Sequence, residues 1–161
     1  LCLPRRNSKN SNRRATSLSL TKFWGRGLSP IMTNPQRWLE LAGDDVRMAE
    51  FALAEGILQQ VCFHCEQAAE KLLKAYLVWK RGFYPKTHSL IQLLHLCRME
   101  DSDFEDLTEL CELLDQFYVA TRYPDAPIGT GPAGSPSRPD AEKAMSAATS
   151  IRTFVQSRIG S

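Results

Sequence analysis

The sequence lacks any long hydrophobic run. No stretch of 18 or more apolar residues occurs in its 161 residues, so we expect no membrane-spanning helix. Alternation of apolar and polar residues, which marks a half-buried strand, is also missing. Neither a phosphate-binding P-loop nor a G-x-G-x-x-G turn is present. These absences favour an all-α domain that contains no motif able to carry out catalysis unaided.

Acidic residues are absent from residues 1–31, which hold seven of the 20 lysines and arginines. All 18 acidic residues follow, so the remainder is net acidic and lacks the basic surface of a duplex-DNA binder. The first 31 residues are rich in Ser, Asn and Arg, which predicts a basic, disordered leader. Since Met32 directly precedes the first helix signal, we interpret this leader as not native or as an idle tail; a transit peptide is the alternative. Residues 32–161 then form one domain.

The sequence contains only five cysteines. Their odd number argues against a disulfide framework. Free thiols suit a reducing compartment, so we predict a cytoplasmic protein. Cys62 and Cys65 form a C-x-x-C, but a zinc site would need a second ligand pair at suitable spacing. We therefore predict that these cysteines are small buried residues, and that the protein holds no metal and no cofactor.

Apolar residues recur at spacings of three and four, which predicts amphipathic helices. Asn34 followed by Pro35 gives the first helix an N-cap and a proline at its first position, and Gly56 ends it. The second helix runs from about 57 to 81 and is closed by Gly82. Its apolar surface is so wide that this helix is either central in a bundle or buried against a second copy of the chain. The residues predicted to face inward are Trp38, Ala42, Val46, Ala49 and Leu53, then Val61, Cys65, Ala68, Leu72, Tyr76 and Trp79.

Two further helices follow before a loop. Thr87 is predicted to cap a short third helix. Ser102 with Glu105 three residues later is typical of a capping box and opens the fourth helix, and Pro124 ends it. The predicted inward residues are Leu90, Leu93, Leu94 and Cys97, then Leu107, Leu110, Cys111, Leu114, Phe117 and Tyr118.

Residues 124–139 hold five prolines and three glycines, which predicts a loop. A fifth helix covers about 139–159. The predicted fold class is thus all-α, an up-and-down helical bundle of four to five helices. The inward residues of the fifth helix are Ala141, Met145, Ala148, Ile151 and Val155.

A polar stripe runs along the second helix. His64, Gln67, Lys71 and Lys74 are spaced three, four and three apart, which places them within an arc of about 80°. Two amines, an amide and an imidazole on one face could hold a phosphate and the edge of a base. The alternative is a solvated helix face in which Glu70 and Lys74 form an ordinary i,i+4 pair.

A second candidate cluster ends the fourth helix. Tyr118 and Arg122 lie one turn apart, and Tyr123 and Asp125 follow at once. Arginine offers a planar fork of donors for phosphate, and tyrosine offers a stacking surface. The alternative is a structural pair between Arg122 and Asp125. Together the two clusters give the predicted nucleotide-binding residues: His64, Gln67, Lys71, Lys74, Tyr118, Arg122, Tyr123 and Asp125.

Four segments, in this order, resemble the HEPN domain family: WLELAGDDVRMA from Trp38, FHCEQAAEKLLKAYL from Phe63, THSL from Thr87 and YVATRYPD from Tyr118. The resemblance spans roughly residues 35–159. It implies a helical bundle that commonly pairs into a homodimer. It also implies a frequent partner, a minimal nucleotidyltransferase, with which such proteins form toxin–antitoxin or related systems.

Some members of that family are ribonucleases through an R-x4–6-H motif near the start of a late helix. Here no histidine follows His95, so Arg122 has no such partner. Arg81 and His88 have the spacing, but they span a turn with Gly82 and belong to a different part of the fold. No catalytic residue is therefore assigned.

We expect a non-catalytic module that binds a nucleotide or a nucleotidyltransferase partner. In this expectation Arg122 and Lys74 contact phosphate, and Tyr118 or Tyr123 stacks on a base. Two alternatives stay open: a metal-independent ribonuclease toxin acting through His88, and a purely structural dimerisation subunit.

Overall fold

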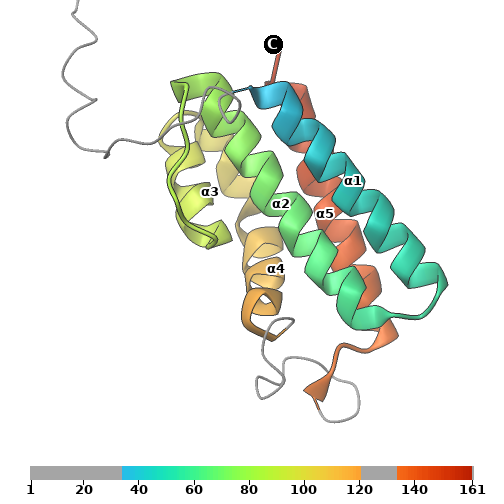
Figure 1. Cartoon of the computed structure of the whole chain (residues 1–161). Coiled ribbons are helices and arrows are strands. Elements are labelled where there is room, and N and C mark those ends of the chain that lie inside the picture. Colours follow the sequence, from blue (N-terminus) through green and yellow to red (C-terminus); the bar gives the residue numbers. More distant parts are fainter. Residues whose placement is uncertain (1–33, 121–133, 161) are drawn as a thin grey trace, which may run out of the picture.

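The computed structural model describes residues 34–120 and 134–160, and within these ranges it is entirely helical and irregular, without strands. The leader predicted for residues 1–31 and most of the loop predicted for 124–139 lie outside these ranges. The elements form an up-and-down bundle (Figure 1), as predicted. In chain order they are α1 (Pro35–Ala54), α2 (Leu58–Arg81), α3 (Leu90–Arg98), the 3₁₀ helix η2 (Ser102–Leu107), α4 (Thr108–Ala120) and α5 (Arg138–Arg158).

Helices α1 and α2 form a tight helical hairpin. The Asn34 side chain accepts a hydrogen bond from the Gln36 amide at 2.9 Å, and Pro35 occupies the first helical position, which confirms the predicted cap. Only three residues connect the two helices, and Gly56 among them has φ +73°. That left-handed conformation costs glycine little, so the chain can reverse within one short turn.

Helix α2 is the central helix of the bundle, the first of the two predicted alternatives. It packs against α1, α3, α4 and α5 (Figure 1). Gly82 ends the helix with φ 76°, and its amide donates to the Val78 carbonyl at 2.8 Å. The side chains that α2 buries include Val61, Cys65, Ala68, Leu72, Leu73 and Tyr76.

The predicted caps of the third and fourth helices are wrong by one or two residues. Ser89, not Thr87, caps α3 by accepting from the Gln92 amide at 3.4 Å. Asp101, not Ser102, begins the next element by accepting from the Asp103 amide at 3.0 Å. Neighbouring hydroxyl and carboxylate groups all compete for exposed amides at such sites. Their sequence spacing alone does not decide which one wins.

Helix α5 closes the core. Ser137 and Asp140 form a reciprocal capping box, with the Ser137 amide donating to the Asp140 carboxylate at 2.8 Å. The inward residues predicted for α3 and α5 are buried, except Met145, which packs at the edge of the core. Among the described residues, no helix is both long and apolar enough to cross a membrane.

Candidate ligand-binding surface

The polar stripe of α2 lies against α1 and the segment before α3. The Lys74 side chain is 5% exposed and that of Lys71 is 20% exposed. This face of α2 is therefore not solvated, although the i,i+4 pair of Glu70 and Lys74 that belonged to the same alternative is present. Buried cations need anionic partners, because desolvation otherwise costs more than the fold can supply. The structure provides two such partners, Asp45 and Glu70.

The Asp45 cluster consists of Asp45, His64 and Lys71. Asp45 lies on α1 and faces two residues of α2 that are two helical turns apart. One carboxylate oxygen lies 3.0 Å from His64 Nδ1. The other accepts from Lys71 Nζ. The carboxylate thus bridges the imidazole and the ammonium and ties α1 to α2.

The Glu70 cluster consists of Glu70, Lys74 and His88. Lys74 Nζ donates to one Glu70 oxygen at 2.7 Å, and the other oxygen lies 3.0 Å from His88 Nδ1. The Glu70 and Lys74 side chains are buried, whereas that of His88 is 59% exposed. The cluster therefore connects a buried ion pair to a histidine at the surface.

Two aromatic rings enclose the buried ammonium of Lys74. Its Nζ lies 5.8 Å from the Trp38 ring centroid and 5.3 Å from that of Tyr84. The two rings meet edge to face, with centroids 4.8 Å apart. Cation–π attraction in a desolvated site adds to the ion pair. Burial and the nearby Glu70 charge also raise the pKa of Tyr84, so this ring remains a neutral phenol.

His88 links this cluster to the end of α4. Its ring stacks on Tyr118, with centroids 5.8 Å apart and an angle of 23° between the planes. The structure thus connects one member of the predicted α4 cluster, Tyr118, through His88 to Glu70 on α2. Arg122, Tyr123 and Asp125 lie outside the described residues.

The remaining predicted residue of the stripe, Gln67, is half-buried. Its amide nitrogen donates to a Glu66 oxygen at 2.8 Å. Glu66 is itself fully buried. Gln67 thus contacts its buried neighbour in α2 rather than the Asp45 or Glu70 cluster.

Arg81 and His88, the pair with ribonuclease-like spacing, have different neighbours. Arg81 Nε donates to Glu100 at 2.7 Å, and its terminal nitrogen donates to the Leu96 carbonyl at 3.3 Å. Those acceptors lie at the C-terminal end of α3 and just after it, whereas His88 is bound to α2. The structure therefore binds these two side chains to different groups.

The cysteines of the C-x-x-C lie in the core, as predicted. Cys62 and Cys65 are fully buried free thiols, and burial raises the pKa of each to about 12. His64 between them points instead to Asp45. In the part of the chain that the structure describes, no three His, Cys, Asp or Glu residues are grouped as metal ligands.

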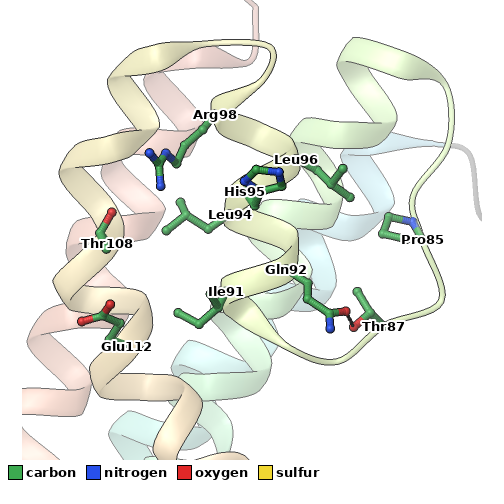
Figure 2. Close-up of a pocket in the computed structure, with 10 residues that line it drawn as sticks. All are labelled: Pro85, Thr87, Ile91, Gln92, Leu94, His95, Leu96, Arg98, Thr108 and Glu112. Atoms are coloured by element: carbon green, nitrogen blue, oxygen red, sulfur yellow. Dashed lines mark hydrogen bonds between the residues drawn. The ribbon is translucent and has the colours of Figure 1, made fainter.

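A separate cleft of about 500 Å³ lies along α3. In Figure 2, Ile91 and Leu94 point toward α4, while Thr87 and Gln92 face each other beside the connector to α2. Its floor is apolar, and Arg98 at its rim is paired with Glu105. None of the predicted nucleotide-binding residues lines this cleft. The full lining is Pro85, Thr87, Ile91, Gln92, Leu94, His95, Leu96, Arg98, Thr108 and Glu112.

A family model of the HEPN domain matches residues 35–158, which includes all of the helices described above. The chain belongs to the HEPN domain family. The match covers both the polar stripe of α2 and the end of α4, so both clusters are part of the HEPN domain itself.

Two solved structures are similar to this HEPN domain over its helical part. TT1696 from Thermus thermophilus is 39% identical, with a TM-score of 0.67; the match covers 76% of this chain and 96% of that one. ST0689, described as an archaeal HEPN homologue, is 27% identical, with a TM-score of 0.64, covering 78% and 98%. A search among curated proteins gave no match.

Five residues of this surface are not among those predicted for the site: Trp38, Asp45, Glu70, Tyr84 and His88. His88 was considered only as a catalytic group, and Trp38 only as a core residue. The sequence did contain an indication of these residues, because lysines that become buried need acidic partners. Two lysines on a helix with so wide an apolar surface need carboxylates nearby, and Asp45 is one of few acidic residues on the inner side of the first helix.

Proposed function

We propose that this HEPN domain is a non-catalytic, homodimeric binding module that engages a nucleotide or a minimal nucleotidyltransferase partner. The surface concerned is formed by the Asp45 cluster, the Glu70 cluster, Gln67 and Tyr118. Arg122, Tyr123 and Asp125, which lie outside the described residues, are the other residues that we propose take part in binding. The observation that carries the proposal is the contact between His88 and Tyr118. This contact joins the Glu70 cluster to Tyr118 of the predicted cluster at the end of α4, and the two are far apart in the sequence.

Within this surface, the residues have different parts. Arg122 supplies the phosphate contact, since a guanidinium binds phosphate through two parallel hydrogen bonds. Tyr118 or Tyr123 stacks on the base. Lys74 is buried and already bound to Glu70, so it supports the surface from below. His64, Gln67 and Lys71 form the half-buried side next to α1.

Nucleotide titration by isothermal calorimetry tests this proposal. We expect the wild type to bind at least one nucleotide, and Arg122→Ala to weaken binding about tenfold or more, as loss of a charge-assisted hydrogen bond does. Lys143→Ala, an exposed cation on α5, is the matched control and should bind like the wild type. No binding of any nucleotide by the wild type would remove the nucleotide half of the proposal.

The homodimer and the partner are tested separately. Sedimentation equilibrium should give twice the chain mass at micromolar concentration. Mixing with a purified minimal nucleotidyltransferase should shift the sedimentation coefficient, and Lys71→Ala with Lys74→Ala should reduce that shift. An unchanged shift in the double variant would instead favour a purely structural subunit.

A second candidate function, a metal-independent ribonuclease, has one observation in its favour. His88 has its Nδ1 bound to a buried carboxylate and its ring exposed, an arrangement that general bases also use. The separate partners of Arg81 argue against it. RNA cleavage by the purified chain that disappears in His88→Ala would support this function, whereas cleavage that persists in the variant would eliminate His88.

A further inference from the structure

The two carboxylate clusters contain the same types of side chain, but their histidines differ in exposure. In each, one carboxylate bridges a lysine ammonium and the Nδ1 atom of a histidine. His64 is 18% exposed, whereas His88 is 59% exposed. Of the two histidines, His88 is therefore the one open to a ligand over much of its ring.

The partner of Nδ1 determines what His88 can offer. An ionised carboxylate has no proton and only accepts hydrogen bonds. Glu70 forms an ion pair with the ammonium of Lys74 at 2.7 Å. At 3.0 Å, His88 Nδ1 must therefore carry the proton and donate it to Glu70. In the neutral ring Nε2 is then left without a proton, as an acceptor.

The position of Glu70 as the hydrogen-bond acceptor of His88 is fixed by its surroundings. Its side chain is 7% exposed, and its lysine partner is enclosed by Trp38 and Tyr84. Removing either group from a buried ion pair leaves an uncompensated charge. The chain of contacts from the aromatic rings through Lys74 and Glu70 thus fixes the tautomer of His88, as carboxylates behind metal-binding histidines do elsewhere.

We infer that His88, rather than a lysine of the α2 stripe, is the ligand-facing residue of this surface, and that its Nε2 atom accepts a hydrogen bond from an N–H or O–H donor of a bound nucleoside. Glu70 and Lys74 are positioning residues for that contact. This inference rests on the proposed function and specifies its ligand: the donor is either the exocyclic amine of a base or the ribose 2′-hydroxyl. Tyr118, stacked on His88, provides the adjoining aromatic surface.

Nitrogen-15 NMR of the full chain tests the positioning without any ligand. His88, assigned with His88→Gln, should show a protonated Nδ1 and a bare Nε2 at pH 8. Glu70→Gln should reverse this pattern, because the new amide can donate to Nδ1. A wild-type His88 with its proton on Nε2 would overturn the inference. If Glu70→Gln does not fold, the wild-type spectrum alone decides.

Calorimetric titration with AMP, 2′-deoxy-AMP and purine riboside monophosphate tests the ligand. We expect His88→Gln to weaken AMP binding about tenfold, the effect of one hydrogen bond, while His95→Gln, an exposed histidine on α3, binds like the wild type. Weaker binding of the deoxy compound identifies the ribose hydroxyl, and weaker binding of the purine compound identifies the base amine. Equal binding of all three, or an unaffected His88→Gln, would overturn the inference while leaving the proposed function intact. If the wild type binds another nucleotide but none of these three, the inference is overturned and the proposed function stands. If it binds no nucleotide at all, the nucleotide half of the proposed function fails as well.

Discussion

Removing the Lys74 ammonium should destabilise the domain far more than removing a surface cation. In Lys74→Met the apolar stem stays, but Glu70 loses its 2.7 Å partner and remains 7% exposed. Truncating one member of a buried pair costs about 3–5 kcal/mol. Because Glu70 keeps the hydrogen bond from His88, we expect the lower end, about 3 kcal/mol. This is a large part of the 5–15 kcal/mol of stability typical of such a domain, on the order of a third of it.

Urea denaturation at pH 7, followed by circular dichroism, measures this cost. The matched control is Arg37→Met, because Arg37 pairs with Glu40 at 3.0 Å while both side chains are more than half exposed; we expect it to cost less than about 1 kcal/mol. The double variant Glu70→Gln with Lys74→Met should cost less than the sum of its single variants, since it removes both charges together. A cost for Lys74→Met close to that of Arg37→Met would refute the argument that this ion pair is buried and essential.

Four further predictions concern the core and the helix ends. Ellman's reagent at pH 8 should leave Cys62, Cys65, Cys97 and Cys111 unreacted until denaturant is added, because each thiol is buried. Burial raises the pKa of Cys62, Cys65 and Cys111 from 9.0 to about 12, so the folded state holds these protons more tightly than the unfolded chain. The free energy of unfolding should accordingly fall as pH rises from 9 toward 12, and alanine variants at these positions should flatten that fall; a pH-independent stability in this range would contradict the assignment. Gly82→Ala should cost about 1–2 kcal/mol in urea denaturation through backbone strain alone, because φ is 76° and a Cβ atom there would meet open space. Ser137→Ala, which removes the α5 capping box, should cost about 1 kcal/mol, and a thermal unfolding midpoint equal to that of the wild type would count against it.

The sequence was a good guide to the helices, but it misplaced the caps of the third and fourth. Asn34 with Pro35 was decisive because proline can begin a helix but cannot continue one. At the start of α3, by contrast, Thr87 and Ser89 are both competent caps, and the difference between them is small. Ser89 is selected because its neighbour Leu90 must be buried, and that requirement comes from packing.

For the candidate surface, the sequence identified the correct helix but not the environment of its polar stripe. Spacing placed His64, Lys71 and Lys74 on one face of α2, and the structure agrees. Spacing could not show that this face lies against α1, since the position of α1 around α2 is a tertiary property. Asp45 and His88 were missed for the same reason. Asp45 is 19 residues from its partner His64, and His88 is 18 residues from its partner Glu70.

By itself, the sequence determined the all-α fold, the central position of the second helix as one of two alternatives, the HEPN family and the burial of its helical cysteines. Those properties depend on short-range periodicity, which is set by 3.6 residues per turn. Only the tertiary structure decided that the lysines of α2 are paired inward and that His88 reaches the surface beside Tyr118. These contacts depend on how separate helices pack, because a buried charge must find its counter-charge wherever the fold places one.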